Sequence, residues 1–91
     1  MTDLRTLTQK SIVSIDFHGK HRAITTVDRI DMPITDRTRV TDVLEYVRVQ
    51  YPALHLDEGS ILVTVNHEVA PLHQALRHKD TVSFLPHIGG G

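Results

Sequence analysis

The sequence predicts a two-layer α+β domain in which a small mixed sheet packs on one main helix. Three observations support this fold class. Two extended runs rich in β-forming residues fill positions 11–34, and a run with helical periodicity follows at 40–51. Two more strand-like runs, at 61–66 and 81–85, complete the order strand, strand, helix, strand, strand.

The first two strands are expected to form a β-hairpin. Val13, Ile15 and Phe17 alternate on one face, as in a half-buried strand. Gly19, in the stretch His-Gly-Lys-His that follows, is suited to a tight turn. In the second run, 22–34, the spacing of apolar residues slips from three to two, which predicts a β-bulge or a twist.

The helical run has a single apolar face, formed by Val40, Val43, Leu44, Val47 and Tyr51. Thr38 or Thr41 is the expected N-cap, and Asp42 lies where the helix dipole favours negative charge. Pro52 is expected to end the helix, because proline excludes helical backbone from the residue before it. The crossover through the helix would let the third strand lie parallel to an earlier one.

The rest of the chain is expected to be loop, turn and terminal segments. Residues 67–76 are predicted to be irregular, and Arg-His-Lys-Asp at 77–80 is predicted to be a turn. We expect a flexible polar leader at 1–10, a folded domain at 11–85 and a flexible glycine-rich tail at 86–91.

Composition narrows the possible functions. The chain has 91 residues, which is room for one domain, and its formal net charge is −1. Such a balance gives no electrostatic footprint for nucleic acid or for an anionic membrane, so neither is an expected partner. There is no cysteine, no signal-peptide pattern and no stretch of transmembrane length. We therefore expect a cytoplasmic location.

Candidate groups for catalysis or metal binding do not form a recognisable motif. The chain has seven histidines: His18, His21, His55, His67, His73, His78 and His87. None has the spacing of a metal-binding pair with an acid between, so we expect surface histidines and no metal site. No serine lies in a Gly-x-Ser-x-Gly elbow. We expect the chain not to be an enzyme in its own right.

The stretch Ser-Phe-Leu-Pro-His-Ile-Gly-Gly-Gly at 83–91 carries the functional prediction. Glycine lets another chain approach the backbone closely, so these residues could be drawn into a narrow enzyme channel. The carboxylate of Gly91 is then the group to be activated with ATP. Apolar residues upstream, Phe84, Leu85 and Ile88, would anchor the base of the tail. A frayed end or an accidental glycine tract is the alternative.

This combination resembles the MoaD/ThiS family of ubiquitin-like sulfur carriers. The tail from Leu85 and Pro86 to Gly90-Gly91 is similar to MoaD tails, with Gly89 at the position of the small residue. Three other stretches resemble family motifs in the right order: Arg-Val-Thr-Asp-Val-Leu at 39–44, Val-Asn-His-Glu at 65–68, and the turn before the last strand.

The resemblance implies a β-grasp (ubiquitin-like) fold and a carrier acted on by other proteins. An E1-like adenylyltransferase of the MoeB/ThiF type would adenylate Gly91 with ATP, and a persulfide protein would supply sulfur to form a thiocarboxylate. A downstream synthase would accept that sulfur in the biosynthesis of molybdopterin, thiamine, thiolated tRNA or a cysteine-type metabolite. The implied partner-binding residues are Phe84, Leu85, Pro86, His87, Ile88, Gly89 and Gly90, and the chain itself would bind no cofactor.

Two other functions use the same residues differently. A ubiquitin-like modifier would join Gly91 to lysines of other proteins. A non-conjugating β-grasp interaction module would not need the glycines. One departure from the family also carries an expectation: Lys79 stands where the family usually has glycine. If that turn needs a positive φ, Lys79 costs on the order of 1 kcal/mol; otherwise the turn has changed type.

Overall fold

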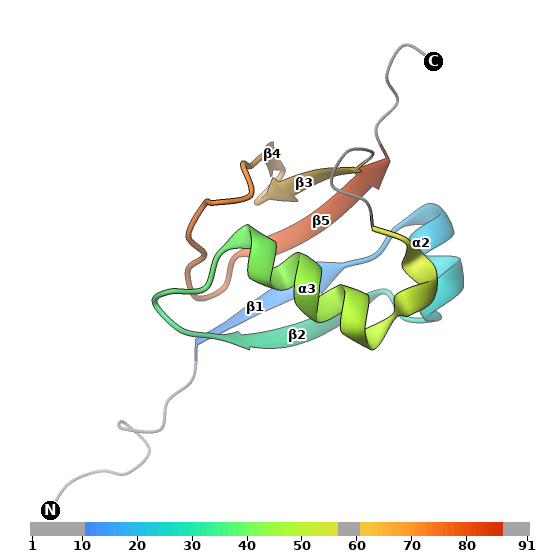
Figure 1. The fold of residues 1–91 in the computed structure, drawn as a ribbon, viewed down its shortest axis with the longest axis horizontal. Coiled ribbons are helices and arrows are strands. Elements are labelled where there is room, and N and C mark those ends of the chain that lie inside the picture. Colours follow the sequence, from blue (N-terminus) through green and yellow to red (C-terminus); the bar gives the residue numbers. More distant parts are fainter. Residues whose placement is uncertain (1–10, 57–60, 87–91) are drawn as a thin grey trace, which may run out of the picture.

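The chain forms a sheet of short strands with one long helix across it (Figure 1). This computed structural model describes residues 11–56 and 61–86; the predicted leader at 1–10 and residues 87–91 of the predicted tail lie outside the described residues. In chain order the elements are β1 (Ser11–Asp16), α2 (Gly19–Thr25), β2 (Arg29–Ile34), α3 (Val40–Gln50), the 3-10 turn η1 (Pro52–Leu54), β3 (Ile61–Val65), β4 (Glu68–Val69) and β5 (Thr81–Pro86).

The sheet is mixed, with the strand order β2-β1-β5-β3-β4. β1 pairs in parallel with β5, whereas the β1–β2, β3–β5 and β3–β4 pairs are antiparallel. The last strand in the sequence, β5, therefore lies in the middle of the sheet, between β1 on one side and β3 on the other. A mixed sheet of this order on one main helix is the β-grasp arrangement, so the predicted fold class is confirmed.

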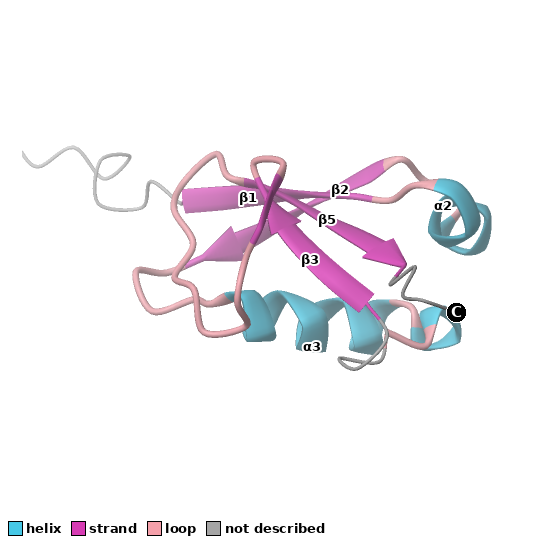
Figure 2. Ribbon diagram, turned by 90° about the horizontal axis from the view of Figure 1, so that it is seen from above, coloured by secondary structure: helices cyan, strands magenta, loops and turns pink. Residues whose placement is uncertain are grey.

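Helix α3 covers one face of the sheet as a separate layer (Figure 2). Its predicted apolar face is confirmed for Val40, Val43, Leu44 and Val47, which are all fully buried, whereas Tyr51 lies just after the helix and is half-buried. The facing sheet residues include Val13 and Ile15 of β1 and Val82 and Phe84 of β5, each buried. Burial of a large aliphatic side chain contributes about 1.5–3 kcal/mol, so this aliphatic layer is the main source of stability.

The predicted hairpin is right in its pairing and wrong in its connection. β1 and β2 are antiparallel neighbours, but Gly19–Thr25 forms helix α2 in place of a tight turn and the start of a strand. A helix of seven residues is too short to show a clear period in sequence. The slip in apolar spacing that suggested a bulge arises because Ile24 and Val27 belong to the helix and to the loop after it.

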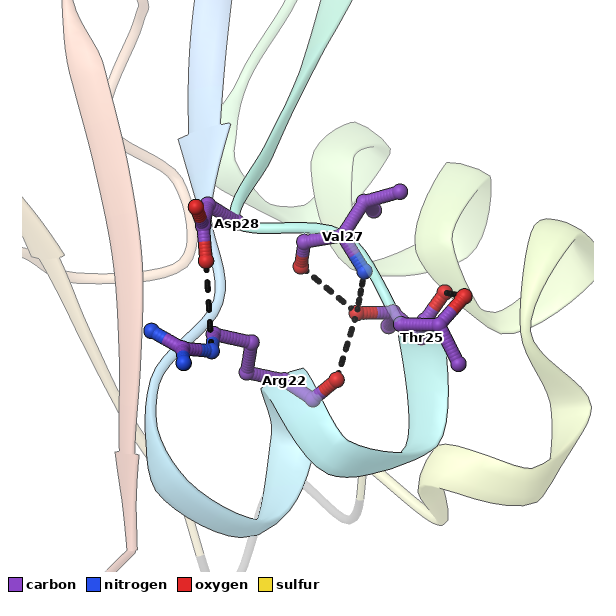
Figure 3. A network of polar contacts seen from close by, with 5 residues as sticks. Arg22, Thr25, Val27 and Asp28 are labelled. Carbon is purple, nitrogen blue, oxygen red and sulfur yellow. Dashed lines mark hydrogen bonds and ion pairs between the residues drawn. The ribbon is translucent and has the colours of Figure 1, made fainter.

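The end of α2 is tied to the start of β2 by local polar contacts (Figure 3). The Thr25 hydroxyl donates to the carbonyl of Val27 at 2.9 Å and accepts from the Val27 N–H at 3.3 Å. Arg22 forms an ion pair with Asp28, with 3.2 Å between Nε and Oδ1. Thr25 is buried although its neighbours are exposed, so this threonine fixes the direction in which the chain enters β2.

The predicted N-caps of α3 are wrong. The cap position is Arg39, whose backbone N–H donates to the Asp42 carboxylate at 2.8 Å. Thr38 instead accepts a hydrogen bond from the Thr35 N–H, and Thr41 lies inside the helix. The first N–H groups of the helix donate to carbonyls of a loop that is distant in sequence. The N–H of Val40 donates to the carbonyl of Gln74 at 3.0 Å, and that of Thr41 donates to the carbonyl of Leu72 at 2.9 Å. Tertiary contacts thus replace the side-chain cap.

The second half of the chain adds a strand that the sequence did not predict. β3 and β4 form a hairpin in which Val65 pairs with Glu68. Asn66 and His67, between them, both have positive φ, as a type I′ turn requires. β3 runs in the same direction as β2, as predicted, but it pairs with β5 and β4. β5 extends to Pro86, one residue beyond its predicted end.

The turn before β5 is held by the β3–β4 hairpin. Asn66 donates from Nδ2 to the Asp80 carboxylate and accepts the Thr81 N–H at Oδ1, both at 2.9 Å. Asp80 also accepts the Arg77 N–H at 2.8 Å, which closes the predicted turn at 77–80. Lys79 lies in that turn with φ of 75°, so of the two alternatives considered for this position the structure has the one with a positive φ.

Candidate functional site

The carboxyl end of β5 lies beside helix α2, although the two are far apart in sequence. Asp16, the last residue of β1, is level with Ser83 of the parallel strand β5. Parallel strands end at the same edge of a sheet, so the chain that leaves β1 and the chain that leaves β5 emerge together. Figures 1 and 2 show α2 on the side of the sheet to which β5 points.

A groove lies at this edge. We call it the tail-base groove, and it is lined by His18, Gly19, Lys20, His21, Phe84 and Leu85. Its volume is about 220 Å³. Small-molecule sites usually occupy roughly 300–1,000 Å³, so this groove suits a protein side chain better than a cofactor. The lining is mostly apolar, and it also includes Lys20 and two histidines.

Lys20 is the formally charged side chain among the lining residues of the groove. The pKa of His21 is lowered, first by burial and then by repulsion from His18 and Lys20. Asp16 and Asp28, the nearby acids, are already occupied: Asp28 pairs with Arg22, and Asp16 makes a bidentate contact with Arg29. The hydrogen bond and charge of Asp16 raise the pKa of Arg29.

A second candidate surface lies on the sheet face opposite α3. Leu62 of β3 is directly opposite Leu85 of β5, and Val69 of β4 is opposite Thr64. Leu85 is 41% exposed and Val69 66% exposed. We call Leu62, Val69 and Leu85 the outer apolar patch. Alternate residues of β3 and β5 point into the core, so these side chains face away from the helix.

The predicted site residues are divided between core, surface and the part of the chain that is not described. Phe84 is a core residue, 1% exposed, with its ring stacked 6.4 Å from that of Phe17. Leu85 belongs to both the tail-base groove and the outer apolar patch. Pro86 is the last residue of β5 and pairs with Ile61. The remaining predicted residues lie outside the described residues: His87, Ile88, Gly89, Gly90 and Gly91.

The sequence analysis did not identify the groove residues of α2 as site residues, and of the outer apolar patch it named Leu85 alone. His18 and His21 stood out only as parts of a turn. The signal that could have found them is the parallel pairing of the first and last strands, since it brings the segments after Asp16 and Ser83 to one edge. That pairing is a tertiary contact and has no local sequence signature.

The other candidate groups remain at the surface. His18, His55, His67, His73 and His78 are exposed and His21 is half-buried. Within residues 11–56 and 61–86, no three His, Cys, Asp or Glu side chains gather as a metal site would require. The helices of this part of the chain are also too short and too polar to cross a membrane.

Comparison with known structures defines the class of protein. The fold is similar to that of small archaeal modifier protein 1 from Haloferax volcanii, with a TM-score of 0.74, 17% identity, and coverage of 86% of this chain and 99% of that one. It is also similar to a Pyrococcus furiosus protein described as molybdopterin converting factor, subunit 1, with a TM-score of 0.75, 19% identity, and coverage of 86% and 99%. The chain is therefore a ubiquitin-like β-grasp protein.

Sequence comparison identifies the family. The model of the ThiS family matches residues 15–91, and the chain belongs to that family, within the MoaD/ThiS group of ubiquitin-like sulfur carriers. A stretch of 39 residues is 38% identical to the molybdopterin synthase sulfur carrier subunit of Haemophilus influenzae. That stretch is 43% of this chain and spans about half, 48%, of the relative.

Proposed function

We propose that this protein carries sulfur on its carboxyl-terminal glycine. The observation that supports the proposal most is the family match, which runs from residue 15 through the tail to Gly91. The structure adds that β5, from which the tail continues, is the central strand of the sheet. A strand paired on both sides is a rigid base from which a partner can draw the tail.

The proposed chemistry uses the Gly91 carboxylate as a nucleophile and then as an acyl donor. A carboxylate oxygen attacks the α-phosphorus of ATP and pyrophosphate leaves. The acyl adenylate is a better electrophile because AMP is a good leaving group. The terminal sulfur of a donor persulfide displaces AMP, and a second thiol of the donor releases the thiocarboxylate by forming a disulfide. The carrier itself turns nothing over and binds no cofactor; ATP is held by the partner.

The partners of this proposal are an E1-like adenylyltransferase, a persulfide protein and a synthase that accepts the sulfur. Their contact surface is proposed to combine residues 85–90 with the outer apolar patch, and Phe84, which is 1% exposed, supports it from the core. Leu85 links the two, since it lies opposite Leu62 on the sheet and directly before Pro86. Exposed apolar side chains grouped in this way are typical of protein–protein contact surfaces. A cytoplasmic location, where such enzymes and ATP are available, is part of the proposal.

The test is to incubate the purified chain with ATP, a persulfide donor and an E1-like enzyme from the same genome. We expect the intact mass to change by the replacement of one oxygen by sulfur, located on Gly91 by fragmentation. A chain lacking Gly91 is the control, and it should remain unmodified with an unchanged melting temperature. Absence of the mass change with an enzyme that adenylates another carrier would refute the proposal.

A second candidate function is protein modification through the same glycine. The fold similarity to small archaeal modifier protein 1 is the observation that favours it. In this case the acyl adenylate is transferred to a lysine amine and an isopeptide bond forms. Conjugates of higher mass would be seen in cells and would disappear on deletion of Gly90 and Gly91. If deletion of residues 89–91 leaves the cellular function intact, the chain is a non-conjugating interaction module.

A further inference from the structure

The tail-base groove has a composition that favours one kind of occupant. Its lining is mostly apolar and includes Leu85, which is 41% exposed, and Gly19. Lys20, His18 and His21 also line it, and no acidic side chain is among its lining residues. A mostly apolar groove that also has a lysine suits an aliphatic side chain that stands beside a carboxylate.

The positive charge of Lys20 is not neutralised by the acids nearby. Asp28 is paired with Arg22 at 3.2 Å, and Asp16 is held by Arg29. Within residues 11–56 and 61–86, no side-chain hydrogen bond or ion pair engages Lys20. A cation at the edge of an apolar surface interacts more strongly with an incoming carboxylate than one in bulk water does, because the local dielectric constant is lower.

The position of the groove points to the protein that would fill it. Leu85 lines the groove, and the next residue, Pro86, is the last residue of β5. An enzyme that binds the chain at Pro86 therefore lies next to the groove. The volume of about 220 Å³ accommodates a single side chain.

We propose that the tail-base groove receives an aliphatic side chain flanked by a carboxylate, presented by the enzyme that adenylates this protein. The aliphatic group packs on Leu85 and Gly19, and the carboxylate pairs with Lys20. This contact shares Leu85 with the outer apolar patch, but Gly19 and Lys20 lie outside that patch. The assignment of the partner rests on the proposed function, whereas the chemistry of the groove does not.

The first experiment tests the groove without any enzyme. The probe is isocaproate, which joins a leucine-sized group to a carboxylate, and its neutral amide is the matched ligand. We expect isocaproate to shift the backbone amide resonances of Gly19, His21 and Leu85 with saturation in the millimolar range. Affinity should be about three- to fivefold weaker for the amide, the effect of one exposed ion pair.

Charge reversal provides the matched variants. Lys20→Glu should weaken isocaproate binding at least as much as the amide does, and Lys20→Ala is the milder substitution should the reversal disturb α2. Lys79→Glu is the control, since Lys79 is also an exposed lysine but lies in the turn at the other end of β5. Equal affinity for acid and amide, or an unchanged response in both Lys20 variants, overturns the proposal.

The second experiment measures adenylation of the chain by the E1-like enzyme through ATP–pyrophosphate exchange. Lys20→Glu should raise KM for the carrier about three- to tenfold with kcat unchanged, because the contact is remote from the reacting atoms. Lys79→Glu should match the wild type. An unchanged KM for Lys20→Glu overturns the partner assignment.

Two outcomes separate this inference from the proposed function. If isocaproate binds at the groove but the wild-type chain is never adenylated, the proposed function and the partner assignment both fail, while the carboxylate site stands. If a chain ending at Pro86 binds isocaproate several-fold more tightly than the full chain does, the protein's own tail competes for the groove. That second result overturns the assignment to a partner.

Discussion

Strand β5 enters the sheet through a turn rich in hydrogen bonds and leaves it beside a mostly apolar groove that is also lined by Lys20. At the entry end, Asn66 and Asp80 bond to each other and to the backbone of Thr81 and Arg77. At the exit end, Leu85 is 41% exposed. One end thus uses its polar groups to fix the register of the strand, and the other leaves apolar and charged groups available for contact with another molecule.

The largest expected effect distinguishes two adjacent residues at the exit end. Phe84→Ala removes a ring that is buried against Phe17, so we expect a loss of about 3–5 kcal/mol in the free energy of unfolding. Leu85→Ala removes an exposed side chain and should cost about 1 kcal/mol or less. Urea denaturation of both variants measures the difference. Similar losses for the two would mean that the exit end is not divided into core and contact surface.

The next largest expected effect is a loss of stability on substitution of Asn66, at the entry end of β5. Asn66→Ala removes two hydrogen bonds and a residue tolerant of positive φ, so we expect a loss of about 2 kcal/mol. Asn66→Gly removes the same bonds but accepts the backbone conformation, and its loss should be about 1 kcal/mol. Denaturant titration of both variants separates the contribution of the bonds from that of the turn. A loss within error of zero for both would show that the network does not hold β5.

A substitution in the same turn should stabilise the protein. Lys79 has φ of 75°, a conformation that costs a side-chain-bearing residue on the order of 1 kcal/mol. Lys79→Gly should therefore raise the free energy of unfolding by about 1 kcal/mol, whereas Lys79→Ala keeps the strain and should change it little. Melting temperatures of the two variants provide the measurement. Equal effects would assign the change to the lost lysine side chain instead of the backbone.

The smallest expected effect is on the pH dependence of stability, through His21 at the exit end of β5. The pKa of His21 lies below its ordinary value of 6.5, mainly because burial disfavours the charged form. Between the lowered value and 6.5 the unfolded chain binds more protons than the folded chain, so stability falls as pH decreases through that window. The melting temperature of the wild type should decrease more on acidification than that of His21→Gln. His73→Gln, at an exposed histidine, should retain the wild-type slope; a slope shared by all three proteins would contradict the assignment.

The sequence predicted the elements that bury a periodic apolar face. Val40, Val43, Leu44 and Val47 repeat along α3 and are all fully buried, and β1, β3 and β5 were placed within a residue or so of their ends. Helix α2 and strand β4 were missed because each is too short for its pattern to emerge. The caps of α3 were wrong because its N–H groups bond to carbonyls of the 72–74 loop, which no local rule anticipates.

By itself the sequence determined the fold class and the tail that supports the proposed function, because hydrophobic periodicity and glycine content are local properties of the chain. Only the tertiary structure decided that α2 stands at the exit of β5, since the parallel pairing of Asp16 with Ser83 joins segments far apart in sequence. It also decided that Phe84 is buried in the core and Leu85 is exposed. Adjacent residues in a strand point to opposite faces, and only packing against α3 determines which of those faces becomes the core.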